Sequence, residues 1–104
     1  MEFGSLSGWQ EKAAALQPEA RLFINGEYGP AADGATFVTE DPWAQRPLAQ
    51  VARGKKADVD RAVSAAKAVF ERGDWSRAAP AARKAVLNRL AELMEQHHEA
   101  LALL

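Results

Sequence analysis

Few residues in this chain have the type and spacing that chemistry requires. His97 and His98 are its two imidazoles, and adjacent helical residues point about 100° apart, so they cannot share a metal ion as an i, i+4 pair could. Glu92, Glu95 and Glu99 have the spacing of one helical face, which is typical of a solvated side, and no partner for acid or base work is visible. These residues do not predict a catalytic centre.

Other reactive groups are missing from the sequence. None of the 104 residues is a cysteine, which excludes disulfides, thiolate metal sites and a cysteine nucleophile within this chain. No glycine-rich phosphate loop of the G-x-G-x-x-G or Walker type occurs. The basic run Arg53-Gly54-Lys55-Lys56 lacks interleaved aromatic residues for base stacking, so a loop leading into a helix explains it better than a nucleic-acid site.

Composition places the chain among ordinary globular proteins. Hydrophobic residues make up 48% and charged residues 26%, which is too apolar for a disordered chain. The net charge of −1 provides no overall attraction to nucleic acid or anionic lipid. No apolar stretch approaches the roughly 20 residues of a membrane span, and the first residues do not resemble a secretory signal. We expect a cytoplasmic protein that binds neither nucleic acid nor membrane.

The first part of the chain predicts one short helix. Leu6–Leu16 has apolar residues at helical spacing, with Ser7 as its N-cap. Pro18 ends the helix because proline cannot continue the hydrogen-bond ladder. We therefore expect residues 1–20 to form an N-terminal helical arm.

Short strands follow this arm. Asn25-Gly26 predicts a tight hairpin, because this pair suits the two positive φ angles of a type I′ turn. Alternating β-forming residues predict further strands at 36–39 and 48–52, with a turn at Asp41-Pro42.

Two amphipathic helices complete the pattern. The first begins near Ala57 and has Gly73 as its C′ residue; its apolar stripe consists of Val59, Ala62, Val63, Ala66, Val69 and Phe70. The second begins near Pro80 and has the stripe Val86, Leu87, Leu90, Leu93 and Met94. We expect Val59, Val63, Ala66 and Phe70 of the first helix to be buried against Leu87 and Leu90. The expected fold class is α+β: an N-terminal helix, a β-hairpin and short strands, then two amphipathic helices.

Apolar residues continue to Leu104, and no cap or polar tail follows the last helix. Natural domains usually finish with a capped element or a short polar tail. We therefore expect a truncated chain, with part of the stripe formed by Leu93, Met94, Leu101 and Leu104 left exposed.

Several segments together carry a family resemblance. They are Leu22-Phe23-Ile24-Asn25-Gly26-Glu27-Tyr28, Thr36-Phe37-Val38-Thr39-Glu40-Asp41-Pro42, Pro47-Leu48-Ala49-Gln50-Val51-Ala52-Arg53-Gly54, Asp58-Val59-Asp60-Arg61-Ala62-Val63 and Arg83-Lys84-Ala85-Val86-Leu87-Asn88-Arg89-Leu90. In this order and spacing they resemble the opening of the aldehyde dehydrogenase superfamily over about residues 21 to 104. The residues Trp9-Gln10 and Arg21-Leu22-Phe23 make the beginning most similar to bacterial γ-glutamyl-γ-aminobutyraldehyde dehydrogenases of putrescine breakdown.

The resemblance implies a fragment of the α/β aldehyde dehydrogenase fold, in which residues 21–104 begin the NAD-binding domain. A full-length relative would oxidise an aldehyde to an acid with NAD or NADP, using a cysteine thiolate that lies outside these residues. This chain alone would be inactive and would bind no cofactor. Its expected partners are the rest of the aldehyde dehydrogenase fold or copies of itself. The alternative is a small non-catalytic interaction module that uses exposed helix stripes.

The resemblance also implies one metal site. Many relatives hold a sodium or potassium ion with backbone carbonyls of a T-x-[ND]-P turn, and oxygen ligands suit such hard cations. Here that turn is Thr39-Glu40-Asp41-Pro42, so Thr39 and Glu40 would be the donors. The remaining ligands of such a site lie outside this chain, and a glutamate replaces the small apolar residue common at its second position.

Overall fold

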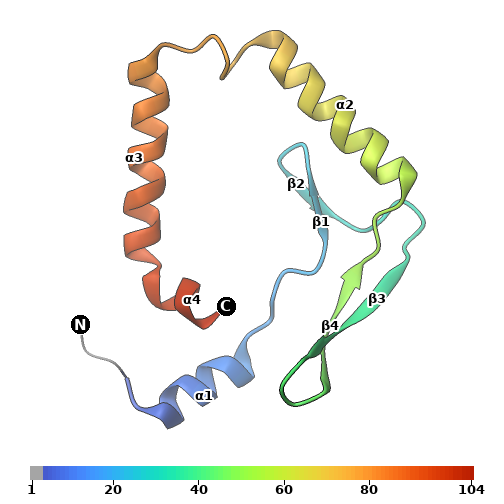
Figure 1. Ribbon diagram of the computed structural model, residues 1–104, viewed down its shortest axis with the longest axis vertical. Coiled ribbons are helices and arrows are strands. Elements are labelled where there is room, and N and C mark those ends of the chain that lie inside the picture. The colour runs from blue at the N-terminus through green and yellow to red at the C-terminus, as the bar shows by residue number, and fades with distance from the viewer. Residues whose placement is uncertain (1–3) are drawn as a thin grey trace. The chain divides into compact units, whose positions relative to one another are not determined.

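The computed structural model describes residues 4–104, so the first three residues of the predicted arm lie outside the described part. The chain forms two compact units. One unit is Glu19–Ala78, and the other joins the chain up to Pro18 with Ala79–Leu104 (Figure 1). The expected fold class is confirmed, whereas the domain boundary between residues 20 and 21 stays a prediction.

The unit Glu19–Ala78 opens with the predicted hairpin. Strands β1 (Leu22–Ile24) and β2 (Glu27–Gly29) pair antiparallel, with Ile24 opposite Glu27. Asn25 and Gly26 both have positive φ angles, 54° and 83°, as a type I′ turn requires. The predicted turn is therefore confirmed.

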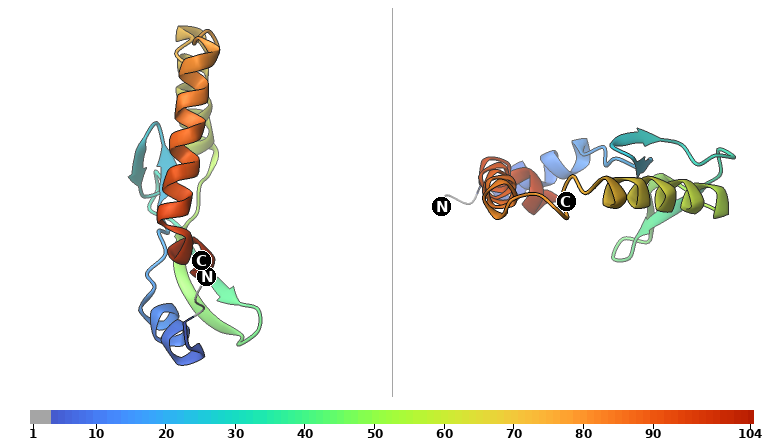
Figure 2. Two further views of the ribbon diagram at one scale, coloured as in Figure 1. Left: turned by 90° about the vertical axis from the view of Figure 1, so that its left-hand side faces the viewer. Right: turned by 90° about the horizontal axis from the view of Figure 1, so that it is seen from above.

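A second hairpin forms a separate two-stranded sheet in the same unit (Figure 2). Strands β3 (Thr36–Asp41) and β4 (Arg46–Ala52) pair antiparallel. The strands predicted at 36–39 and 48–52 are confirmed, and each extends two residues further toward the turn. The extension follows from the last pair of the ladder, Asp41 with Arg46, whose opposite charges also lie 3.6 Å apart.

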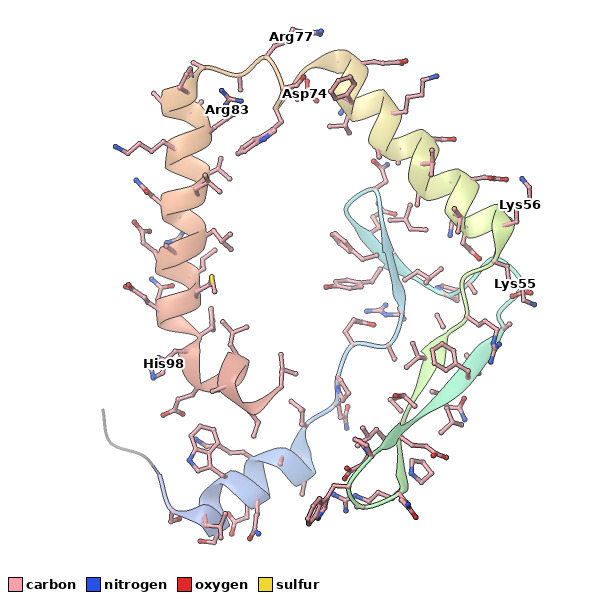
Figure 3. All side chains as sticks on the ribbon, viewed as in Figure 1. Lys55, Lys56, Asp74, Arg77, Arg83 and His98 are labelled. Carbon is pink, nitrogen blue, oxygen red and sulfur yellow. The ribbon has the colours of Figure 1, made fainter. Side chains whose placement is uncertain are left out.

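Helix α2 (Lys56–Arg72) runs beside the first hairpin (Figure 1). It ends at Gly73, which adopts the left-handed conformation with φ 79°, as predicted for its C′ residue. The Arg77 side chain folds back over this glycine and donates hydrogen bonds of 2.9 and 2.6 Å to the carbonyl oxygens of Glu71 and Arg72. Figure 3 shows Asp74 and Arg77 in the segment that follows the helix.

The face of α2 that meets the hairpin differs from the predicted one. The half-buried residues are Ala62, Ala65 and Val69, at helical spacing from the buried Asp58. Val63 and Phe70 are 60% and 71% exposed. The prediction that they are buried is wrong, because the smaller stripe of the helix packs on the hairpin.

The other unit contains the remaining helices, α1 (Leu6–Ala15), α3 (Pro80–Gln96) and α4 (His98–Leu103). The N-cap of α1 is Ser5, whose hydroxyl oxygen accepts a hydrogen bond of 3.2 Å from the backbone N–H of Gly8. The predicted cap Ser7 is wrong, since this residue already lies inside the helix.

Helix α3 begins at Pro80 as predicted, and His97 separates it from α4. Helices α1 and α4 are in contact, and Lys12 donates a hydrogen bond of 2.9 Å to Glu99. Leu87 and Leu90, the predicted partners of the α2 stripe, are exposed in α3. The exposure expected for the stripe that includes Leu93, Met94, Leu101 and Leu104 is confirmed.

Little of the described chain is buried. Ala31 and Asp58 are the buried side chains, each 3% exposed, and they lie close together in the unit Glu19–Ala78. No helix within residues 4–104 combines the length and apolar character that crossing a membrane requires.

Candidate functional site

The one buried charge among residues 4–104 belongs to Asp58, in the first turn of α2. Its carboxylate accepts hydrogen bonds from the backbone N–H groups of Ala32, at 2.9 Å, and Lys55, at 3.0 Å. The guanidinium of Arg61 donates a third, at 3.1 Å. The carboxylate therefore ties the start of α2 to the loop between β2 and β3.

These donors act on the ionisation of Asp58. The N–H of Lys55, followed by the N–H of Ala32 and the charge of Arg61, holds the pKa of this carboxyl below its ordinary value, although burial acts in the opposite direction. Because protein donors occupy both carboxylate oxygens, Asp58 serves the structure of the unit. No local pattern in the sequence indicates the contact of Asp58 with Ala32, which lies 26 residues earlier.

The two lysines of the basic run are both paired with carboxylates. Lys55 donates to Asp33 and Lys56 to Asp60, each at 2.5 Å, and Figure 3 places both lysines at the start of α2. The guanidinium of Arg53 lies 5.2 Å from the centre of the Phe37 ring. The interpretation of this run as a loop that leads into a helix is confirmed.

Thr39 and Glu40, the predicted cation donors, lie near the end of β3. The register of the hairpin shifts between them: Thr39 pairs with Ala49, but Glu40 pairs with Pro47. Because proline has no N–H group and a bulge interrupts the ladder, this point of the sheet is short of backbone donors. Carbonyl oxygens at such a point fit a hard cation, and the cation site at Thr39 and Glu40 stays a prediction.

The turn after Glu40 is held by Asp41. Its carboxylate accepts hydrogen bonds from the backbone N–H groups of Trp43, at 2.9 Å, and Ala44, at 3.2 Å. These two donors, Ala44 first, lower the pKa of Asp41. The predicted turn at Asp41-Pro42 is confirmed, and the side chain of Asp41 is used within it.

The two histidines and the glutamates of α3 and α4 lie on the exposed surface. His98 contacts the carbonyl oxygen of Glu95 through Nδ1 at 2.9 Å, while Glu92 pairs with Arg89 on the exposed surface. Within residues 4–104 no group of three His, Cys, Asp or Glu side chains has an arrangement that could hold a metal ion. The solvated face that the spacing indicated is confirmed.

An apolar groove lies between the first hairpin and α2. Aromatic side chains from three segments line it together with small residues of the helix: Phe23, Ile24, Ala62, Ala66, Phe70 and Trp75. No ionisable side chain lines this groove, so it can cover an apolar surface but cannot exchange protons. Its members come from separate elements, so no local pattern in the sequence indicates this groove.

Comparison with known proteins identifies related chains. The model of the aldehyde dehydrogenase family matches residues 29–104. NADP/NAD-dependent aldehyde dehydrogenase PuuC of Escherichia coli is 64% identical over 104 residues, which is 100% of this chain and 21% of that protein. The chain therefore spans about a fifth of the length of this relative.

Solved structures show the same fold. Gamma-glutamyl-gamma-aminobutyraldehyde dehydrogenase of Burkholderia cenocepacia superposes with a TM-score of 0.88 at 47% identity, over 94% of this chain and 20% of that one. An indole-3-acetaldehyde dehydrogenase of P. syringae, solved with NAD+, superposes with a TM-score of 0.86 at 48% identity, over 93% of this chain and 20% of that one.

Proposed function

Because this chain belongs to the aldehyde dehydrogenase family, we propose that it forms the amino-terminal part of an NAD(P)-dependent enzyme that oxidises an aldehyde to the acid. The observation that carries the proposal is 64% identity to the Escherichia coli relative over the whole chain. The proposed substrate is γ-glutamyl-γ-aminobutyraldehyde, an intermediate of putrescine breakdown. The likeness to the Burkholderia cenocepacia enzyme of that name supports this choice.

The proposed role of these residues is to build part of the scaffold. The sequence has no cysteine, so the nucleophile must come from another part of such an enzyme. NAD or NADP accepts a hydride when it is bound. The sequence has no glycine-rich phosphate loop that fits a dinucleotide, so we assign no residue of this chain to the cofactor.

We also propose that the carbonyl oxygens of Thr39 and Glu40 contribute to a sodium or potassium site in the longer protein. The interrupted ladder opposite Glu40 supports this, since Pro47 has no N–H to offer. The other ligands would come from residues beyond this chain. We also propose that the protein is cytoplasmic. The proposed partner of these residues is the rest of the aldehyde dehydrogenase fold.

A second candidate is a non-catalytic interaction module. The exposed apolar stripe of α3, with Leu87 and Leu90 each more than half exposed, favours it. The two candidates differ in one respect: only the first requires these residues to function within a complete aldehyde dehydrogenase.

A chimera tests the proposed function. This chain replaces the corresponding 104 residues of the Escherichia coli relative, and aldehyde-dependent NAD reduction is compared with that of the intact relative and of the relative without this segment. We expect activity within about tenfold of the intact relative, a loss of at most ~1.4 kcal/mol of transition-state stabilisation, and none without the segment. A soluble but inactive chimera would contradict the proposal.

A further inference from the structure

We propose that Asn25 is a site of spontaneous covalent modification, in which the backbone nitrogen of Gly26 attacks the side-chain amide of Asn25 and releases ammonia. The two residues form the turn of the first hairpin. The reaction gives this turn a carboxylate where the sequence has an amide. It needs neither an enzyme nor a cofactor, so the inference does not depend on the proposed function.

The modification consists of one ring closure and one ring opening. A bond forms between the Gly26 nitrogen and Cγ of Asn25, the bond from Cγ to Nδ2 breaks, and Nδ2 leaves as ammonia with the proton of the Gly26 nitrogen. Water then opens the five-membered imide. Opening at Cγ gives aspartate, whereas opening at the main-chain carbonyl gives isoaspartate, in which the backbone runs through the former side chain. One water molecule is consumed and one ammonia molecule is released, without any oxidation or reduction.

The reacting groups of Asn25 and Gly26 are accessible. Both residues are exposed, and a Cβ placed on Gly26 would meet no atom within 4 Å. Among residues 4–104, neither the N–H of Gly26 nor the side-chain amide of Asn25 has a hydrogen-bond partner. The attacking nitrogen therefore gives up no contact with the chain, and glycine has no side chain that would hinder its approach.

The pair Asp33-Gly34 also places a short polar side chain before a glycine, but its groups are engaged. The N–H of Gly34 donates a hydrogen bond of 2.8 Å to the carbonyl oxygen of Ala31. The Asp33 carboxylate accepts hydrogen bonds from the N–H of Ala35, at 2.9 Å, and from Lys55. Lys55 also holds the pKa of Asp33 below its ordinary value. An ionised carboxylate is a poor electrophile, so this pair does not share the reactivity inferred for the hairpin turn.

Asn88 is the other asparagine of the sequence and provides an internal reference. It lies inside α3, where the nitrogen of the following Arg89 belongs to the hydrogen-bond ladder of the helix. Ring closure at Asn88 requires this part of the helix to unfold first. We therefore expect Asn88 to react slowly in the folded chain.

The first hairpin is short enough to open. Each of its strands has three residues, and an isolated hairpin of two strands is at best marginally stable in water. Closing a five-membered ring changes the backbone angles of Asn25, so the turn must open before the attack. The Tyr28 ring opposes this opening, because it lies 4.8 Å from the ring of Phe23 on the paired strand. The rate at Asn25 should therefore depend on this aromatic contact.

Both products change the hairpin turn. Each product adds a negative charge two residues before Glu27, and isoaspartate also adds a carbon to the backbone. The pairing of Ile24 with Glu27 does not accommodate a longer turn. Ile24 lines the groove together with Ala62 and Ala66 of α2, so the modified hairpin should pack less firmly on this helix.

The test follows both asparagines of the 104-residue chain by peptide mass spectrometry during incubation at mildly alkaline pH, and released ammonia is measured in parallel. Asn25→Asp removes the leaving group, and aspartate also accepts a positive φ angle. Tyr28→Ala weakens the first hairpin. The matched control is Phe37→Ala in the second hairpin, because the ring of Phe37 lies 5.2 Å from the guanidinium of Arg53, much as that of Tyr28 lies 5.4 Å from Arg21.

We expect Asn25 to convert at least about tenfold faster than Asn88 in the folded chain. The rate should rise with pH, because the attacking nitrogen must lose its proton. Tyr28→Ala should raise the rate at Asn25 by about two- to fivefold, whereas Phe37→Ala should leave it unchanged. Asn25→Asp should release ammonia only at the slow rate of the remaining amides. The converted chain should melt at a lower temperature than the fresh chain.

Several results would overturn the inference. Conversion of Asn25 no faster than that of Asn88, or undiminished release of ammonia from Asn25→Asp, refutes the modification site. A rate at Asn25 that Tyr28→Ala does not raise, or that Phe37→Ala raises equally, refutes opening of the first hairpin as the controlling step. Equal melting midpoints of the fresh and converted chains refute the predicted loosening of the hairpin.

Discussion

Asp58 gives the sharpest prediction about how the unit Glu19–Ala78 holds together. In the variant Asp58→Asn one carboxylate oxygen remains an acceptor and the other becomes an NH2 donor. The oxygen Oδ1 accepts from Ala32 and Arg61, and Oδ2 accepts from Lys55, so either orientation of the amide places a donor against a donor. The substitution therefore removes at least one charge-assisted hydrogen bond without changing the size of the side chain.

The expected loss of stability is large for this chain. Losing a hydrogen bond to a charged group at a buried site lowers the melting midpoint of a domain of this size by on the order of 10 °C. The matched control is Asp60→Asn, because Asp60 also lies in the first turns of α2 but its side chain is exposed and pairs with Lys56. This control should shift the midpoint by no more than about 2 °C. Far-ultraviolet circular dichroism follows both melts.

The effect should also depend on pH. The folded pKa of Asp58 is lowered, so its ionised form stabilises the fold fully above the unfolded aspartate pKa of about 3.9, and this contribution is lost as pH falls through the folded value. The difference between the unsubstituted chain and Asp58→Asn should therefore be constant near neutral pH and shrink below about pH 4. A difference that stays the same at pH 3, or equal shifts for Asp58→Asn and Asp60→Asn, would refute the reasoning.

Three further predictions follow from the structure. Gly73→Ala should destabilise the chain by about 1–3 kcal/mol, because φ is 79° and the new Cβ would collide with the Arg77 guanidinium. The matched control is Gly29→Ala, where the new Cβ meets open space and φ is not positive. Urea titration should show a clearly smaller loss of folding free energy for this control. The Arg21 side chain, followed by the backbone N–H of Arg21, lowers the pKa of Glu19 to about 2. NMR titration of Arg21→Gln should therefore show a higher pKa for Glu19 that stays below its ordinary value, because the backbone donor remains. The stabilisation that this exposed pair provides is present at neutral pH and is lost as pH approaches 2. The 104-residue chain should not reduce NAD with any aldehyde, because it has no thiolate nucleophile, and turnover above a blank would contradict this.

Local signals in the sequence predicted most of the elements. Asn25-Gly26 specifies its turn through two positive φ angles, and Gly73 ends α2 in the same way. Such features depend on neighbouring residues alone. The N-cap of α1 shows the limit, since Ser5 and Ser7 are both suitable residues and their hydroxyl oxygens lie only 3.1 Å apart.

Contacts between distant residues could not be predicted in this way. The tie from Asp58 to Ala32 spans 26 residues, and neither residue signals the other. The same is true of the register shift in the second hairpin, where the pairing of Glu40 with Pro47 depends on where the ladder begins. The resemblance placed Thr39 and Glu40 at this point, but spacing alone would not have selected them.

The rotation of α2 shows why the helix was predicted correctly and its packing was not. Two stripes of this helix are small or apolar, and they lie about 100° apart. The bulkier stripe, with Val63 and Phe70, was predicted to lie in the core, because larger side chains release more free energy when they are buried. The hydrogen bonds of Asp58 fix the rotation of the helix instead, and they turn Ala62 and Ala65 toward the hairpin. The bulkier stripe is therefore left exposed, with Val63 at 60% and Phe70 at 71%.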